Sequence, residues 1–103
     1  MYIQYAGFDL QADSRTYNFH VIDVSREARE FKVSLRGSAF GSSPLKIQDG
    51  PAISMARLKR ELDLETLASP AESSLRVEQR DIQEYIEKTY PKPVKKLGLG
   101  PKS

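Results

Sequence analysis

Apolar and polar residues alternate most regularly between positions 16 and 36. One apolar set recurs with a period of two in each half of this stretch: Tyr17, Phe19 and Val21, then Phe31, Val33 and Leu35. Alternate residues of a β-strand point to opposite faces of its sheet. The pattern therefore predicts two antiparallel strands joined by a charged turn, with one face in a core and the other largely in water.

Residues 2–10 predict a further strand, because aromatic and branched side chains suit a pleated surface. The apolar phase slips between Tyr5 and Phe8, where Ala6 and Gly7 predict a β-bulge or bend. The Asp and Ser of residues 11–15 predict a turn that folds this strand back onto the next. The N-terminal half is thus expected to be a three-stranded meander whose edges are residues 2–10 and 31–36.

Residues 37–51 are rich in Gly, Ser and Pro and predict a long connection. Connections of this length are uncommon without a use. Either three large apolar residues pin the loop to the core, or the loop is mobile and binds a partner; these residues are Phe40, Leu45 and Ile47. The pinned alternative is favoured, because the mobile one would leave all three in water.

A helix is predicted near residues 52–67, with Pro51 at its start, where the missing N–H does no harm. Met55, Leu58 and Leu62 form its apolar stripe. Two further apolar residues, Leu64 and Leu67, lie off this stripe. We therefore expect the helix to bend or end between residues 63 and 68, and this second pair to pack in another direction.

A second helix is predicted at residues 79–90, where apolar residues recur at helical spacing and Pro91 ends the pattern. Leu75 to Val77 is a candidate short strand that could extend the sheet. The predicted fold class is α+β: a small antiparallel sheet of three or four strands, beginning as a meander and packed on one face by two C-terminal helices.

A chain of 103 residues is predicted to form one domain. The domain spans residues 1–91, and residues 92–103 form a flexible basic tail, with four lysines, no acid and repeated Pro and Gly. Without those four lysines, 12 of the 16 basic residues remain against 14 acids. The net charge of +2 therefore originates in the tail.

Composition narrows the class of protein. An apolar fraction of 39% with 29% charged residues is typical of a globular protein in water. No apolar run approaches the roughly 20 residues of a membrane helix, and residues 1–11 lack the features of a signal peptide. The sequence thus predicts a cytoplasmic protein without a membrane partner.

The absence of cysteine excludes disulfides, iron-sulfur clusters, thiolate zinc sites and thiol catalysis.

The sequence contains no recognisable catalytic, metal-binding or cofactor-binding set. His20 is the single histidine, and a lone histidine on a strand is more often structural than catalytic. The glycines of residues 37–41 lack the later glycine and lysine of a phosphate-binding loop. Paired carboxylates on the second helix are typical of a solvated helix face. We therefore predict a noncatalytic protein that uses no cofactor.

Four basic residues are candidates for contacts with nucleic acid: Lys32, Arg36, Arg57 and Arg60. The first two lie on the polar face of the predicted sheet and the others on the first helix, where they could neutralise phosphates. Neighbouring acids oppose this charge, and no aromatic residue is interleaved for stacking on bases. A mixed-charge solvated surface is therefore the favoured interpretation.

No pattern in the sequence determines a biochemical activity. The first hypothesis is a small noncatalytic protein-binding or adaptor module, which engages an unknown protein partner or a second copy through a strand edge or through the helix-and-loop surface beside it. The alternative is a weak nucleic-acid-binding protein that uses basic residues of the sheet face and the tail. The sequence favours the first hypothesis, because catalytic sets are missing whereas an edge strand and a long loop are present.

Overall fold

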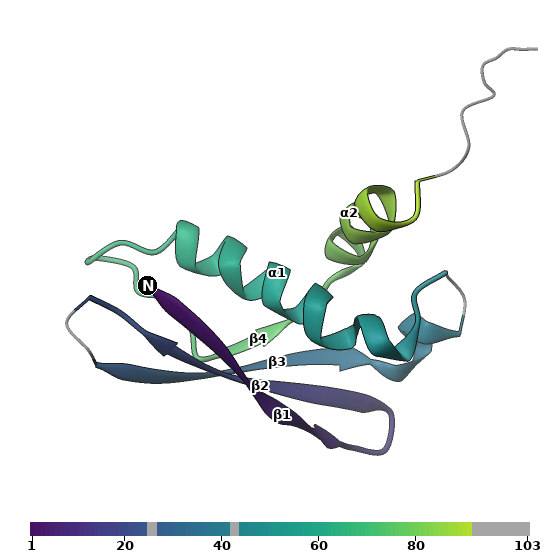
Figure 1. The fold of residues 1–103 in the computed structure, drawn as a ribbon, viewed down its shortest axis with the longest axis horizontal. Helices are drawn as coiled ribbons and strands as arrows, with labels where there is room; N and C mark the ends of the chain where they lie inside the picture. Colours follow the sequence, from purple (N-terminus) through teal and green to yellow (C-terminus); the bar gives the residue numbers. More distant parts are fainter. Residues whose placement is uncertain (25–26, 42–43, 92–103) are drawn as a thin grey trace, which may run out of the picture.

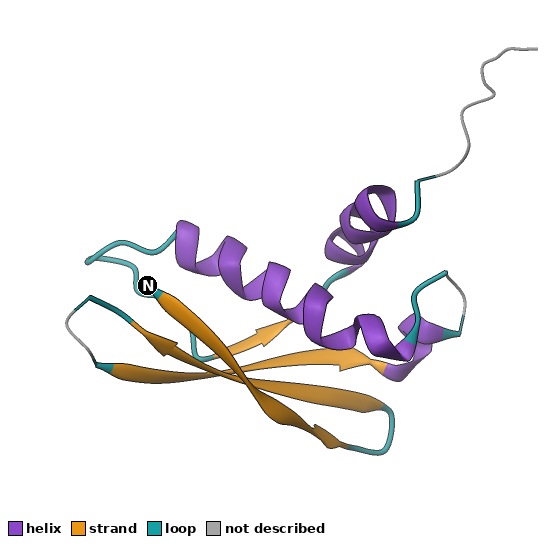
Figure 2. Ribbon diagram, viewed as in Figure 1, coloured by secondary structure: helices purple, strands orange, loops and turns teal. Residues whose placement is uncertain are grey.

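The computed structural model describes residues 1–24, 27–41 and 44–91. The predicted tail, residues 92–103, lies outside the described residues. The elements are β1 (Tyr2–Leu10), β2 (Ser14–Ile22), β3 (Ala28–Arg36), the 3₁₀ turns η1 (Gly37–Phe40) and η2 (Ile47–Asp49), α1 (Gly50–Asp63), β4 (Ser74–Arg76) and α2 (Gln79–Thr89). The predicted α+β class is confirmed, with both helices C-terminal to the first three strands (Figures 1 and 2).

The four strands form one sheet in the order β1-β2-β3-β4. The first three are an antiparallel meander, as predicted. β4 pairs with β3 in parallel, with Lys32 opposite Ser74 and Ser34 opposite Arg76. A parallel partner is possible here because the intervening α1 carries the chain back across the sheet. The short stretch that the sequence left undecided thus joins the sheet and makes it mixed.

The pairing of β1 with β2 contains the predicted bulge. Its register shifts between Tyr5 and Phe8, so that Ala6 and Gly7 together face one position of β2. Gly7 has a φ of 103°, in the region that favours glycine. The irregularity is therefore a β-bulge, and it keeps Tyr5 and Phe8 on the same face of the sheet.

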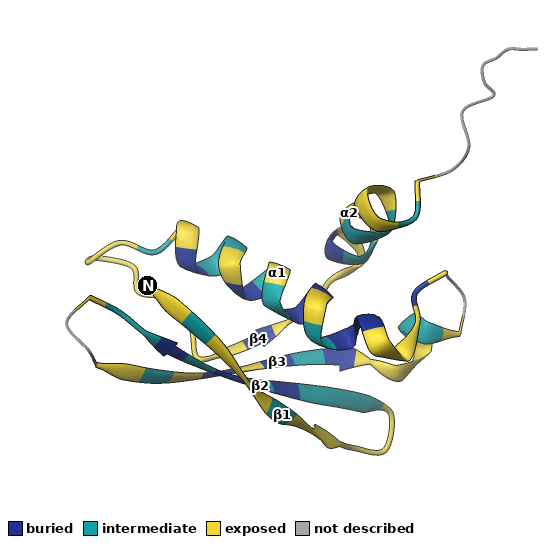
Figure 3. Ribbon diagram, viewed as in Figure 1, coloured by how far each residue is buried: buried dark blue, intermediate teal, exposed yellow. Residues whose placement is uncertain are grey.

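The core lies between one face of the sheet and α1 (Figure 3). β2 and β3 supply the six alternating residues expected from the sequence, all buried: Tyr17, Phe19, Val21, Phe31, Val33 and Leu35. α1 adds Ile53, Leu58 and Leu62, and Leu45, Leu75 and Val77 complete the cluster. The opposite face of the sheet carries no helix among the described residues (Figure 1).

The two helices cover unequal parts of the core. α1 packs on β2, β3 and β4, whereas α2 packs mainly on α1 (Figure 1). α1 ends at Asp63, within the predicted limits. Leu64 and Leu67 follow in an exposed loop, so the expectation that they pack in another direction was wrong. In the described part of the chain, neither helix has the length and apolar character needed to span a membrane.

The connection between β3 and α1 is anchored at two of the three predicted residues. Leu45 is buried in the core, and Phe40 is partly buried against it. Ile47 is 58% exposed, because it lies in η2, which turns the chain into α1. The pinning of this loop therefore depends on Phe40 and Leu45.

The first residue of α1, Gly50, lies directly against the ring of Tyr17. Both residues are buried, and a Cβ atom at position 50 would overlap the hydroxyl and the Cζ atom of Tyr17. The Tyr17 side chain is only 1% exposed, so its ring has little room to move. Gly50 thus permits the close approach of α1 to β2.

We expect Gly50→Ala to destabilise the protein by roughly 1–3 kcal/mol, as overpacking of a core does. Helix propensity alone predicts the opposite sign, because alanine is favoured over glycine by up to about 1 kcal/mol. Urea unfolding measures the difference. The matched control is Gly41→Ala, where a Cβ would make only an ordinary contact with Ser38. Equal stability of the two variants would contradict a tight contact between Gly50 and Tyr17.

Candidate functional site

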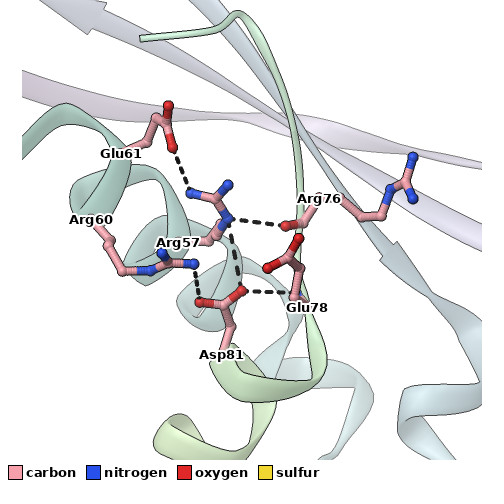
Figure 4. Close-up of polar contacts among 6 residues, drawn as sticks. All are labelled: Arg57, Arg60, Glu61, Arg76, Glu78 and Asp81. Atoms are coloured by element: carbon pink, nitrogen blue, oxygen red, sulfur yellow. Dashed lines mark hydrogen bonds and ion pairs between the residues drawn. The ribbon is translucent and has the colours of Figure 1, made fainter. Parts of the chain in front are cut away.

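Charged and polar side chains are concentrated in three places: the junction of α1 and α2, the start of α1, and the open face of the sheet. At the junction, Arg60 Nη2 lies 2.6 Å from Asp81 Oδ1 and Arg57 Nε lies 3.8 Å from Asp81 Oδ2 (Figure 4). The backbone N–H of Glu78 also donates to Asp81 Oδ2, at 2.8 Å. We call Arg57, Arg60 and Asp81 the Asp81 clamp. The clamp ties the first turn of α2 to the middle of α1.

Arg57 has two further partners in this region. Its Nη1 atom donates to Glu61 Oε1 at 3.0 Å, and its Nε atom donates to the carbonyl of Arg76 at 3.0 Å (Figure 4). The side chains of Arg57 and Asp81 are 12% and 6% exposed. The two helix arginines proposed for nucleic-acid contact are thus already paired with acids, and they join helices to each other.

A second polar cluster surrounds Asp49, the residue before α1. Its Oδ2 atom accepts hydrogen bonds from the Tyr90 hydroxyl at 2.7 Å and the Lys46 N–H at 2.8 Å, while Oδ1 accepts from the Tyr85 hydroxyl at 3.2 Å. Burial acts to raise the pKa of Asp49, but these hydrogen bonds to its charged form outweigh burial and leave the pKa lowered. Asp49 therefore links the start of α1 to the far end of α2.

Both clusters bridge structural elements. The part of the chain that the structure describes contains no group of three His, Asp or Glu side chains that could hold a metal ion. The single histidine, His20, lies on the open face with its Nε2 atom 3.9 Å from Glu30 Oε2. The polar residues at the helices thus connect α1 to α2.

The open face of the sheet carries the other two predicted basic residues. Lys32 Nζ donates to Asn18 Oδ1 at 3.2 Å, and Asn18 Nδ2 donates to Asp9 Oδ2 at 3.2 Å, so Lys32 is joined to a chain that ends in an acid. Arg36 lies further along β3 and is exposed. The structure thus places Lys32 and Arg36 on one face of the sheet and Arg57 and Arg60 at the helix junction behind the opposite face.

Arg36 shares a hollow of the open face with a residue that the sequence analysis missed. The hollow is lined by Asp13, Ser14, Ser34, Arg36, Gly37, Ser38 and Arg76. Arg76 belongs here because β4 pairs in parallel beside β3. The alternating pattern of Arg76 beside Leu75 is the signal that could have placed it on the open face, but the pairing of so short a strand has no signature in sequence.

The described surface also contains an open strand edge. Among the described residues, β1 pairs with β2 on one side and has no strand on the other. The second predicted edge, β3, is covered by β4 from Lys32 to Ser34. The structure therefore leaves β1 as the longer uncovered edge.

Comparisons with known proteins add no relative to this picture. A scan against protein-family models, a search of curated proteins and a search of solved structures each found no match.

We expect Asp81→Asn to destabilise the protein by roughly 2–3 kcal/mol, because it leaves the partly buried guanidinium of Arg60 without its anion and removes one of the two carboxylates beside Arg57. The asparagine oxygen can still accept from the Glu78 N–H, so the loss isolates the ion pairs. Glu87→Gln makes the same chemical change at an exposed site of α2 and serves as the control in urea unfolding. A loss no larger than that of the control would contradict the clamp.

The lowered pKa of Asp49 predicts a pH dependence of stability. The carboxylate stabilises the fold fully above the pKa of about 3.9 of an unfolded aspartate, and this contribution is lost as pH falls through the lower pKa of the folded state. The free energy of unfolding of the wild type should therefore exceed that of Asp49→Asn by less and less as the pH falls below about 5. Urea unfolding at each pH measures this difference. A difference independent of pH would show that the charge of Asp49 does not contribute.

Proposed function

We propose that this protein binds other proteins through β1, a strand that combines a free backbone edge with side chains that α1 does not cover. The strand is nine residues long, and its residues are mostly exposed (Figure 3). Unpaired N–H and C=O groups along such an edge can pair with another chain. β1 therefore offers a template for one additional strand.

An apolar strip accompanies this edge on the helix side of the sheet. The ring of Tyr5 lies 5.6 Å from that of Phe19, and the ring of Phe8 lies 5.8 Å from that of Tyr17, measured between centroids. Phe8 is 47% exposed and Leu10 is 67% exposed. We call Tyr5, Phe8 and Leu10 the β1 strip. Its rings rest on the core but remain accessible from the edge.

Little in β1 protects it against pairing. Natural edges are often guarded by lysine, proline, inward charges or bulges. β1 contains one charged residue, Asp9, and one bulge at Ala6 and Gly7. An accessible edge of this length, with so few features that prevent pairing, favours a binding role.

We propose that this protein is a noncatalytic protein-binding module whose β1 edge adds an extended segment of another protein to the sheet. The observation that carries the proposal is the nine-residue open edge beside the β1 strip. Main-chain hydrogen bonds supply affinity in this mode, and pockets for alternate side chains supply selectivity. The expected ligand therefore has apolar side chains at alternate positions that cover Tyr5, Phe8 and Leu10.

The test is selection of a displayed peptide library on the wild type, followed by amide exchange with a selected peptide. We expect enriched peptides with alternating apolar residues, new protection within residues 2–10, and about a tenfold loss of affinity in Leu10→Lys, since a charge then faces apolar side chains. The control is Leu67→Lys, which makes the same change at an exposed leucine outside the sheet.

Protection elsewhere, or equal effects of the two leucine variants, would overturn the proposal. Sedimentation of the wild type in the absence of peptide identifies the competing occupant. A dimer that Leu10→Lys dissociates and Leu67→Lys leaves intact would mean that a second copy, and not a peptide of another protein, occupies the edge.

A further inference from the structure

The hollow on the open face lies at the end of the sheet that contains Arg36 and Arg76. Ser34 is opposite Arg76 in the register, and Arg36 follows two residues later on the same strand. Such diagonal neighbours are separated by about 4.8 Å across the sheet and about 6.6 Å along the strand, a distance within reach of two long side chains. Leu35 and Leu75 alternate with them and are buried, which fixes both arginines on the solvent side.

The guanidinium groups of Arg36 and Arg76 differ from those of three other arginines, which are paired with acids. Arg29, Arg57 and Arg60 each form an ion pair with a carboxylate. No hydrogen bond or ion pair in the described part of the chain engages the guanidinium of Arg36 or Arg76. Figure 4 shows the Arg76 side chain directed away from the Asp81 clamp, although its carbonyl accepts from Arg57. Two forked donors therefore share one hollow, and neither forms an ion pair with an acid of the described residues.

Hydroxyl groups complete the polar lining of this hollow. Ser14 and Ser34 lie on the open face beside the arginines, and Ser38 enters from η1. Arginine forks match the geometry of phosphate oxygens and can bind them through two parallel hydrogen bonds. The Ser34 hydroxyl can donate to one of the remaining oxygens, whereas the Ser14 hydroxyl already donates to Gln11 Oε1 at 3.1 Å. The chemistry of the hollow is suited to a tetrahedral oxyanion.

We propose that Arg36 and Arg76, with Ser34, form a binding site for a phosphomonoester group, carried by a small metabolite or by a phosphorylated side chain. A monoester places nearly two negative charges on one group near pH 7, which matches two adjacent cations. The site is distinct from the β1 edge, and neither proposal depends on the other.

Acids around the hollow argue against a long polyanion. Asp13 is part of the lining, and Glu30 and Asp9 lie further along the open face. A nucleic-acid strand laid across the sheet would meet these carboxylates, whereas a single group inserted between Arg36 and Arg76 meets Asp13 in the hollow and lies near Glu78, which lines an adjoining hollow with the same two arginines. The local charge pattern therefore favours one phosphoryl group over the phosphodiester backbone.

The experiment is a titration with inorganic phosphate followed by NMR of backbone amides and arginine Nε–H groups. We expect saturable shifts at Arg36, Arg76 and Ser34. Arg36→Gln and Arg76→Gln should each weaken binding at least about tenfold, because each removes a charge-assisted pair of hydrogen bonds. Lysine at either position should not restore the wild-type affinity, because it keeps the charge but loses the fork.

Two controls separate a site from general attraction. Arg80→Gln removes the same charge from an exposed position on α2 and should leave binding unchanged. Asp13→Asn should strengthen binding, because it removes the acid of the hollow. Phosphate binding should weaken below about pH 6, where the second proton returns. Sulfate keeps its charge over this range and should show no such change.

Three further ligands identify which kind of molecule carries the bound phosphoryl group, and they can overturn the proposal. A phosphoserine peptide that binds more tightly than phosphate, while its unphosphorylated form does not bind, assigns the site to a modified side chain. Equal binding of phosphate and a sugar phosphate assigns it to a small ligand. Preferential binding of an oligonucleotide with a steep salt dependence would instead establish a polyanion surface. Absence of saturable shifts, or equal losses in Arg36→Gln and Arg80→Gln, would refute the site.

Discussion

The structure depends on a mismatch of width between the sheet and the helix that covers it. α1 has 14 residues and is therefore about 21 Å long, with a diameter of about 10 Å including side chains. Neighbouring strands lie about 4.8 Å apart, so one helix of this diameter spans only two or three of them. α1 lies over β2, β3 and β4, and β1 remains at the margin. The exposure of Tyr5, Phe8 and Leu10 follows from this geometry.

A single covering helix must also be held firmly, because it supplies one whole side of the core. Gly50 lets its first turn approach Tyr17, and the two acidic clusters connect it to α2 at both ends of that helix. Asp81 is in the first turn of α2, whereas Tyr90 follows its last residue. The short α2 thus adds little area over the sheet but fixes the position of α1. This explains why most ion pairs in the described chain are at the helices, away from the open face.

The sequence predicted those parts of the fold that depend on local periodicity. The buried residues of β2 and β3, the bulge at Gly7 and the end of α1 near Asp63 all follow from patterns within one element. The pairing of β4 and the role of Asp81 did not, because each depends on contacts across the fold. Arg57 and Asp81 are far apart in sequence, and no local pattern predicts their meeting. For the same reason, no sequence pattern predicted that Arg76 would be a neighbour of Arg36.

The distribution of arginines illustrates how topology, more than composition, determines which charges remain available. On the helix side, parts of the chain that are distant in sequence bring acids to Arg29, Arg57 and Arg60. On the open face, the nearest strand partners of Arg36 and of Arg76 are Ser14 and Ser34, which cannot neutralise a cation. Exchanging these serines for acids would satisfy both arginines within the sheet. Their polar but uncharged character leaves two forked cations facing solvent at a site where an external anion can supply the missing charge.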